Sequence, residues 1–317
     1  MRRAFITLYV LLLSSPAIAQ QAPKDHLGLK PLTEMTAEDK YKGEDGGLYG
    51  GGKNEPPEAH AKAAKAELAK IAPVDGKVVL LSIGMSNTTQ EFSAFKGMAD
   101  KEAGKSPSLV IVDGAQGGQA ALQWSTKEAK AWPEVDKRLK AAGLTAAQVQ
   151  ILWIKQAEMR PSQYGEFPKH SQKLQTSLIA ILNLAKERFP NLRVAYLSSR
   201  TYAGWASSEL NPEPYSYESA FAVRSLILSQ IAKKDPALNY DKAAGAVKSP
   251  LLLWGPYLWA DGVTPRKADK LTWEKADVVE KDGTHPSDSG RKKVADLLLK
   301  FFTTDEGAKG WFLKAKK

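Results

Sequence analysis

The chain has 317 residues, of which 43% are hydrophobic and 25% charged, with a formal net charge of +10 and no cysteine. This composition is ordinary for a globular protein with a sizeable core, and the absence of cysteine excludes disulfides, thiolate metal sites and a cysteine nucleophile. The positive charge would suit polyanions, but the lysines are scattered and no RNA- or DNA-binding motif occurs, so we predict no nucleic-acid partner.

The start of the chain has the pattern of a secretory signal. Arg2 and Arg3 precede an apolar run over residues 4–13, and the segment ends in small residues at Ala17-Ile18-Ala19. The apolar run is short for a membrane span, and no acylatable cysteine follows it. We therefore predict a signal peptide over residues 1–19, cleaved near Ala19, a secreted or periplasmic mature protein, and no transmembrane segment in the mature chain.

The next segment, residues 20–57, is rich in glycine, proline and charge and has no helical or strand period. We predict an extended arm or linker there, and the sequence leaves open whether it lies against the main domain or is disordered. The main domain is predicted over residues 58–317. It begins with an alanine- and lysine-rich amphipathic helix over residues 58–71.

Within the main domain, apolar runs alternate with helical patterns. Strands are expected at residues 77–83, 108–112, 149–155, 192–198 and 250–254. Parallel strands joined by right-handed helical crossovers predict a three-layer α/β/α sandwich with a five-stranded parallel sheet in the flavodoxin-like order 2-1-3-4-5. In such a sheet, ligands bind at the carboxyl ends of strands 1 and 3.

Two short motifs almost 200 residues apart can together supply a nucleophile, a base and a group that orients the base. Ser86 stands in Gly84-Met85-Ser86-Asn87, at the carboxyl end of the first predicted strand. Asp282 precedes His285 by three residues, so one turn can present both side chains together. Histidine has the pKa to deprotonate a serine near neutral pH, and an aspartate would fix its tautomer. The alternative is a helix-entry turn capped by Ser287 or Asp288; both interpretations can hold.

These motifs resemble the SGNH (GDSL-like) hydrolase superfamily, whose serine lies in a G-x-S-[LN] turn and whose Asp-x-x-His block precedes the C-terminal helix. A second block, from Gly117-Gly118 to Trp124, is similar to that of carbohydrate esterases such as sialate O-acetylesterases and acetylxylan esterases. The resemblance covers roughly residues 77–302, in four short motifs that occur in the right order. It implies a serine esterase with a Ser86–His285–Asp282 triad that removes small acyl groups, acetyl above all, from a carbohydrate through an acyl-enzyme.

The resemblance also implies the donors that stabilise the tetrahedral oxyanion. The Ser86 backbone N–H follows from the turn that carries the nucleophile. The second block adds the N–H of Gly118, with Gly117 as the nearest alternative, because a glycine pair lets the backbone approach the substrate closely.

A third block, Trp153 to Glu158, departs from the family's common Gly-x-Asn-Asp. It is closer to the Trp-x-Gln-Gly-Glu of the sialate-esterase branch but has one extra residue. We predict that the Gln156 amide supplies a third oxyanion donor. Two alternatives stay open: Lys155 or Glu158 faces the site instead, or Gln156 bonds a neighbouring loop.

Two long predicted loops, residues 199–216 and 255–282, are unusually rich in aromatic residues. Such rings can stack on sugar faces, or they can pack the loops onto the protein. Together with the motif residues, they give these candidate substrate-binding residues: Asn87, Gly117, Trp124, Tyr202, Trp205 and Trp259.

Two further functions compete with that of a carbohydrate esterase. A lipase or thioesterase of the same superfamily would need an apolar acyl channel, whereas the loops carry amphipathic rings and charges, namely Arg200, Glu209, Glu213 and Arg266. A carbohydrate-binding surface protein without turnover would not need all three triad residues. No metal- or nucleotide-binding motif occurs, so we predict no cofactor and no metal, and an acylated carbohydrate as the substrate. The sequence leaves the sugar and the oligomeric state open.

Overall fold

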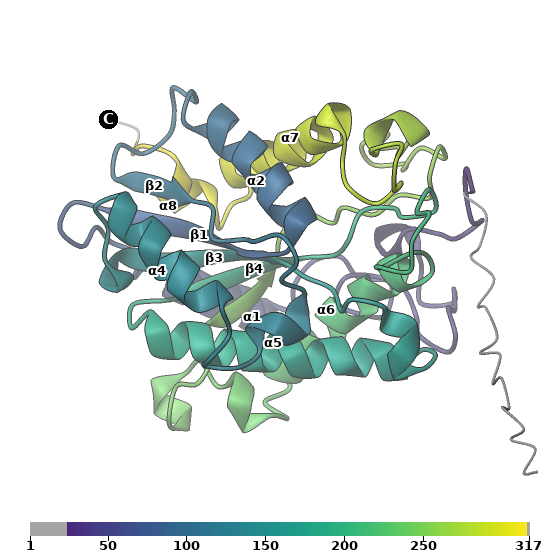
Figure 1. Cartoon of the computed structure of the whole chain (residues 1–317). Coiled ribbons are helices and arrows are strands. Elements are labelled where there is room, and N and C mark those ends of the chain that lie inside the picture. Colours follow the sequence, from purple (N-terminus) through teal and green to yellow (C-terminus); the bar gives the residue numbers. More distant parts are fainter. Residues whose placement is uncertain (1–23, 316–317) are drawn as a thin grey trace, which may run out of the picture.

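The computed structural model describes residues 24–315 (Figure 1). The predicted signal peptide and residues 20–23 of the predicted arm lie outside the described residues. The strands are β1 (Val78–Gly84), β2 (Leu109–Val112), β3 (Val149–Lys155), β4 (Val194–Ser198) and β5 (Leu251–Trp254). The helices are α1 (Glu58–Leu68), α2 (Ser86–Ala99), α3 (Ala121–Trp124), α4 (Ala131–Ala141), α5 (Lys169–Arg188), α6 (Tyr215–Ile231), α7 (Asp288–Thr304) and α8 (Lys309–Phe312). Short 3-10 helices lie at Leu32–Glu34, Ala146–Gln148, Pro161–Tyr164, Pro236–Leu238, Lys242–Ala244 and Lys275–Asp277.

The five strands form one parallel sheet in the order β2-β1-β3-β4-β5, which confirms the predicted fold class and strand order. Each observed strand begins within two residues of its predicted start. Every residue of β1, β3 and β4 is buried. Parallel strands are covered on both faces, which is why they appear in the sequence as continuous apolar runs rather than as alternating patterns.

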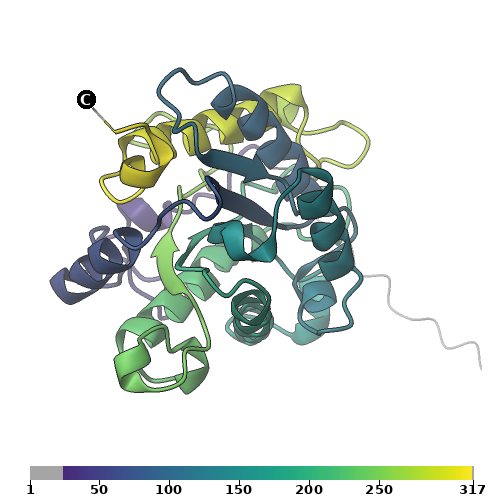
Figure 2. The ribbon, with the colours of Figure 1, turned by 90° about the vertical axis from the view of Figure 1, so that its left-hand side faces the viewer.

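Helices cover both faces of this sheet (Figures 1 and 2). On one face lie α2, α7 and α8, where Phe92 of α2 stacks on Trp153 of β3 with ring centroids 5.4 Å apart. Phe95 of α2 also meets Phe302 of α7. The opposite face is covered by α5 and α6. None of the helices within residues 24–315 is both long and apolar enough to cross a membrane.

The described part of the predicted arm, residues 24–57 (hereafter the arm), packs against the main domain. Leu32 is fully buried. The Tyr41 ring lies 4.9 Å from that of Tyr217 on α6, and Arg224 of the same helix donates hydrogen bonds to Glu44 and Asp45. The sequence leaves this question open, and the structure resolves it: the arm is docked on α6.

The first residues of the arm join the two long loops that the sequence singled out. The Lys24 N–H donates to the Gly204 carbonyl (2.8 Å) in one loop. In the other loop, the Asp261 carboxylate accepts the Leu27 N–H (2.7 Å), and the Val263 N–H donates to the Asp25 carbonyl (2.9 Å). Residues 24–29 therefore hold both loops at once.

Candidate active site

Ser86 is the first residue of α2, directly after β1. The helix can start this close to the strand because residue 84 is glycine: a Cβ there would lie 2.3 Å from Thr88 Oγ1. At the first helical position, the Ser86 N–H has no acceptor within the helix. The helix dipole also places partial positive charge at this end. The start of α2 is therefore suited to stabilise negative charge that develops beside Ser86.

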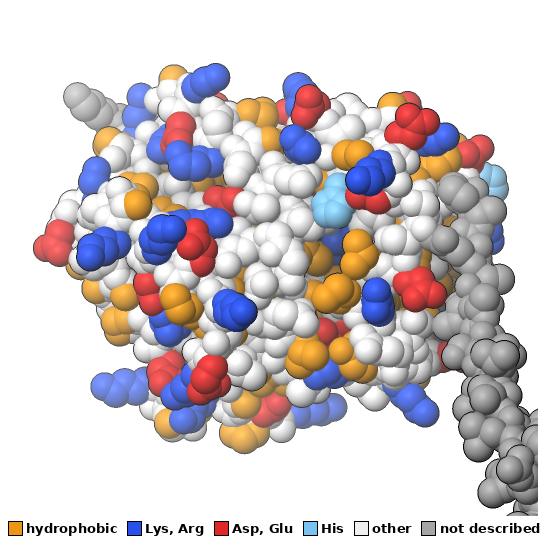
Figure 3. Space-filling model, in the orientation of Figure 1, with side chains coloured by type: hydrophobic (Ala, Val, Ile, Leu, Met, Phe, Trp, Pro, Cys, Tyr) orange, Lys and Arg blue, Asp and Glu red, His pale blue; other side chains and the backbone are white. Residues whose placement is uncertain are grey.

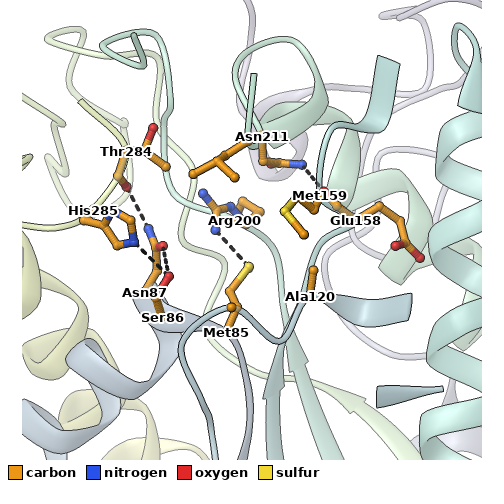
Figure 4. Close-up of a pocket in the computed structure, with 12 residues that line it drawn as sticks. Met85, Ser86, Asn87, Ala120, Glu158, Met159, Arg200, Asn211, Thr284 and His285 are labelled. Atoms are coloured by element: carbon orange, nitrogen blue, oxygen red, sulfur yellow. Dashed lines mark hydrogen bonds between the residues drawn. The ribbon is translucent and has the colours of Figure 1, made fainter. Parts of the chain in front are cut away.

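A continuous hydrogen-bonded chain connects the three predicted triad residues, and Figure 4 shows the part between Ser86 and His285. Ser86 Oγ lies 2.9 Å from His285 Nε2. The second ring nitrogen of this histidine, Nδ1, lies 2.6 Å from Asp282 Oδ2. These are the distances that a general base needs to take a proton from a serine while a carboxylate holds its ring.

The Asp282 carboxylate is held by its own turn. Its Oδ1 accepts hydrogen bonds from the backbone N–H groups of Thr284 (2.8 Å) and His285 (2.9 Å). Partial burial acts to raise the pKa of Asp282, but these two bonds and the contact with the His285 ring outweigh it and hold the pKa below its usual range. The group therefore stays ionised, as the orienting member of such a chain must.

The turn that carries Asp282 and His285 is fixed against neighbouring loops. Gly283 has φ +57, and a Cβ there would lie 1.8 Å from the Trp205 carbonyl oxygen, so only glycine fits. Asn87 Nδ2 donates to the Thr284 carbonyl across 2.8 Å, which ties this turn to α2 (Figure 4). Ser287 caps α7 by accepting the Gly290 N–H, so the helix-entry interpretation of the motif holds alongside the triad interpretation.

A small pocket of about 60 Å³ opens beside Ser86; we call it the Ser86 pocket. His285, with its side chain 26% exposed, lines the pocket, and a histidine is visible on this face of the molecule (Figure 3). Four of the predicted site residues line it: Ser86, Asn87, Gly118 and His285. The rest of its wall comes from Met85, Ala120, Glu158, Met159, Arg200, Leu210, Asn211 and Thr284. Within residues 24–315, no group of three or more His, Asp or Glu side chains is arranged to hold a metal ion.

Gly118 occupies the place predicted for an oxyanion donor. It lines the pocket with φ +73, a conformation that favours glycine. Its N–H has no backbone hydrogen-bond acceptor among the residues that the structure describes. Gly117 is adjacent, since a Cβ there would lie 3.9 Å from the Ser86 Cβ.

Gln156 requires a correction, because it does not line the pocket. It is buried, and its Nε2 donates to the Gln119 carbonyl (3.3 Å) while its Oε1 accepts the Ala157 N–H (3.3 Å). The amide therefore holds the backbone next to Gly118, as expected for a residue that bonds a neighbouring loop. In the same block, Glu158 reaches the pocket, whereas the Lys155 ammonium points into the interior to bond Glu91.

The aromatic candidates also require a correction. Trp124, Tyr202 and Trp259 are buried and do not line the pocket, so their faces are not free to stack on a sugar. Trp124 packs edge-on against Trp132 (5.0 Å between ring centroids), and Trp259 lies 6.0 Å from Tyr202. Half-buried Trp205 is also absent from the pocket lining. These rings pack the loops onto the protein.

Four residues of the pocket wall were missed by sequence reasoning: Met159, Arg200, Leu210 and Asn211. In the sequence, Arg200 stands out only as a charge in a loop, yet it follows the end of β4 by two residues. Its position at the carboxyl edge of the sheet is a signal that could have placed it near Ser86. The remaining three come from irregular segments, for which a residue pattern carries no comparable signal.

No protein-family model and no curated protein matches the chain. Among solved structures it is similar to a GDSL-like lipase from Bacteroides thetaiotaomicron, with 11% identity and a TM-score of 0.41, over 76% of this chain and 95% of that one. A Bacteroides fragilis protein provisionally assigned as an acylhydrolase shares 12% identity, with a TM-score of 0.41, over 78% of this chain and 97% of that one. A salicylyl-acyltransferase from a tetracycline biosynthetic pathway shares 13% sequence identity, with a TM-score of 0.36, over 70% of this chain and 52% of that one. Likenesses with TM-scores below 0.5 carry no functional argument, so the function rests on the site itself.

Proposed function

We propose that this chain is a serine esterase of the SGNH type that removes a small acyl group, acetyl above all, from a carbohydrate. One observation carries the proposal: the hydrogen-bonded chain from Ser86 Oγ through the His285 ring to Asp282, with Ser86 at the N-terminus of α2. A serine with no catalytic task does not need a histidine on its hydroxyl and a carboxylate behind that histidine.

In this mechanism, Ser86 Oγ attacks the ester carbonyl carbon while His285 Nε2 accepts its proton. The Ser86 and Gly118 N–H groups stabilise the negative charge on the former carbonyl oxygen. His285 then protonates the departing sugar oxygen, which leaves an acyl-Ser86 ester. A water molecule, deprotonated by His285, attacks this ester, and His285 returns the proton to Ser86 Oγ as the carboxylic acid leaves. Throughout, ionised Asp282 stabilises the imidazolium and fixes its tautomer.

The pocket volume supports a small acyl group. A cavity needs at least roughly 10–15 Å³ to hold one water-sized group, so the Ser86 pocket, at about 60 Å³, has room for only a few such groups, which favours a short acyl group. The apolar wall formed by Met85, Ala120 and Leu210 suits a methyl group.

The carbohydrate part of the proposal rests on the second sequence block, which resembles that of carbohydrate esterases. The aromatic loops do not support it, because their rings are buried. Asn211 lines the pocket and adds a polar side chain to its wall. We also propose export, from the signal pattern of residues 1–19; mass spectrometry of the N-terminus after expression in a secreting bacterium tests it.

Hydrolysis of 4-nitrophenyl acetate and butyrate tests the esterase. We expect the unmodified protein to favour acetate, and Ser86→Ala and His285→Ala to lower kcat/KM at least about 10³-fold. Ser93→Ala is the matched control on the same helix, because that serine is exposed and does not line the pocket. His26→Ala replaces an exposed histidine of the arm.

Each pattern of rates has a distinct meaning. Loss of activity in the two triad variants alone supports the proposal, and acetate release from acetylated polysaccharides then tests the carbohydrate. Equal rates in all five proteins would show that the hydrogen-bonded chain does not act on esters. A preference for butyrate would contradict the small acyl site.

A further inference from the structure

Arg200 is a buried cation with no hydrogen-bonded anionic partner among the described residues. The residue is 2% exposed. Within residues 24–315, the guanidinium makes one hydrogen bond, from Nη1 to Met85 Sδ at 3.5 Å, and Nε is sealed from solvent with no acceptor. A thioether is a weak acceptor. An unpaired buried charge is expensive, so a protein rarely leaves one without a use.

The carboxylates that attract Arg200 are already engaged. Both oxygens of Glu91 accept hydrogen bonds from the buried Lys155 ammonium, at 2.6 and 2.5 Å. Glu213 accepts the N–H groups of Ala203 (2.9 Å) and Tyr217 (2.9 Å) and the Trp259 indole N–H (2.8 Å). Neither carboxylate hydrogen-bonds the Arg200 guanidinium, so both attract it only across a distance.

The guanidinium faces the Ser86 pocket. In Figure 4, Arg200 lies between Ser86 on one side and Asn211 on the other, with the Met159 sulfur nearby. The one acidic side chain in the pocket lining, Glu158, directs its carboxylate away from Arg200 (Figure 4) and accepts a hydrogen bond from Ser177. The pocket thus presents an unpaired cation in a largely apolar wall, where electrostatic attraction is strong.

From this arrangement we propose that Arg200 is a specificity-determining residue that binds a carboxylate carried by the ester substrate. The planar guanidinium matches a carboxylate with two parallel N–H donors. The weak contact with Met85 Sδ is easily exchanged for such a pair.

The proposal rests on the esterase function and narrows its substrate class. Because the pocket is small, the carboxylate stands within a few bonds of the scissile ester. It belongs either to the acyl group, as in the half-ester of a short dicarboxylic acid, or to the alcohol, as in an acetylated sugar acid. Arg200 recognises the same chemistry in both cases.

Two pairs of substrates distinguish these sources. For the acyl side, the pair is 4-nitrophenyl succinate and its neutral methyl ester, each corrected for spontaneous breakdown. For the alcohol side, the pair is acetylated methyl glucuronoside and its neutral methyl ester, with release of acetate measured. We expect one anionic substrate to exceed its neutral partner about 10- to 100-fold in kcat/KM, the range of a charge-assisted hydrogen bond.

The variants are Arg200→Gln, Arg200→Lys and the matched control Arg224→Gln. Arg224 is also buried but lies under the arm and does not line the pocket. We compare the ratio of kcat/KM for the anionic substrate to kcat/KM for its neutral partner. We expect Arg200→Gln to bring this ratio to about one, Arg200→Lys to keep part of the preference, and Arg224→Gln to keep all of it. Thermal unfolding of each variant shows that it is folded.

A binding measurement adds a readout that does not depend on turnover. Calorimetric titration of Ser86→Ala with the preferred anionic substrate should show binding that Ser86→Ala/Arg200→Gln weakens about 10-fold or more. A purely structural role for Arg200 would instead lower stability and slow all substrates equally.

Each result decides between the two proposals. Ser86-dependent hydrolysis of neutral esters with no charge preference in either pair overturns the role of Arg200 and leaves the esterase intact. An unchanged ratio in Arg200→Gln overturns it as well. No hydrolysis of any of the four substrates, with Ser86→Ala indistinguishable from the unmodified protein, overturns both.

Discussion

The buried arginine under the arm, Arg224, and the buried arginine of the Ser86 pocket, Arg200, are 3% and 2% exposed. Arg224 makes four hydrogen bonds, to the Glu44 carboxylate, to the carboxylate and carbonyl of Asp45 and to the Gly47 carbonyl. Among the described residues, Arg200 makes one, to a sulfur atom. Burial alone therefore does not distinguish a structural charge from a functional one, whereas the presence of internal partners does.

The largest effect is expected from removing the partnered arginine. Arg224→Met removes the charge-assisted hydrogen bonds to two carboxylates and two carbonyls, which should lower the free energy of unfolding by about 3–4 kcal/mol. Urea denaturation measures it. Since the arm docks away from the pocket lining, kcat/KM of the folded variant should stay within about twofold. A loss below about 1 kcal/mol would mean that the arm's ion pairs are not what anchors it.

Next in size is the effect of Glu213, which attracts Arg200 without pairing with it. Burial raises the pKa of Glu213 to about 7, against the hydrogen bonds that it accepts. A carboxyl with a raised pKa in the folded state contributes stability that is complete below pH ~4.5 and is lost as the pH rises through about 7. The free energy of unfolding should therefore fall over this range by at most about 3 kcal/mol from this group.

Glu213→Gln removes the titrating group and should therefore reduce the fall in the free energy of unfolding as the pH rises. Urea midpoints of both proteins between pH 4.5 and pH 8 measure the difference, which isolates Glu213 from the rest of the titrating groups. Parallel curves would show that Glu213 is ionised throughout, as it would be if Arg200 were its direct partner.

A smaller change is expected from removing the unpartnered arginine. Arg200→Met replaces a desolvated cation that no carboxylate hydrogen-bonds by an apolar side chain, so the free energy of unfolding should stay the same or rise by up to about 1 kcal/mol. The same urea series measures it. A loss of stability as large as that of Arg224→Met would show that Arg200 stabilises the fold, and the two arginines would then not differ in role.

The smallest effect belongs to an exposed ion pair that serves as a baseline. Lys127 and Glu187 meet at 2.5 Å with side chains 64% and 59% exposed. Lys127→Ala should change the free energy of unfolding by no more than about 0.5 kcal/mol, because water solvates both partners. A larger change would show that the urea measurements do not distinguish the effects of buried charges from those of exposed ones.

Much of the fold could be predicted from the sequence because a buried parallel strand needs an unbroken apolar run, and such runs occur in only a few places. The Val149–Lys155 strand matches its prediction to the residue for this reason. The proximity of Ser86 and His285 was expected from the resemblance of their two motifs to those of SGNH hydrolases, together with the place of Ser86 at the carboxyl edge of the sheet.

The rest depends on contacts that no local pattern encodes. The Gln156 amide donates to a carbonyl 37 residues away along the chain, a contact that the residues around Gln156 do not reveal. Trp259 and Tyr202 were candidates for stacking on a sugar because loops are usually exposed, but both side chains are buried where these loops pack onto the protein. The lack of a partner for Arg200 is visible only when every neighbour is in place.

The hydrogen bonds between residues 24–29 and the two loops also determine when, during synthesis of the chain, these loops can take up their final positions. Bonds such as that from Leu27 to Asp261 join residues 234 positions apart. The ribosome makes the arm early, but its partners emerge only after most of the chain, and contacts of such long range form late. The loop that bears Arg200 and the loop that leads to the Asp282 turn are therefore secured together only when the newly made chain is nearly whole.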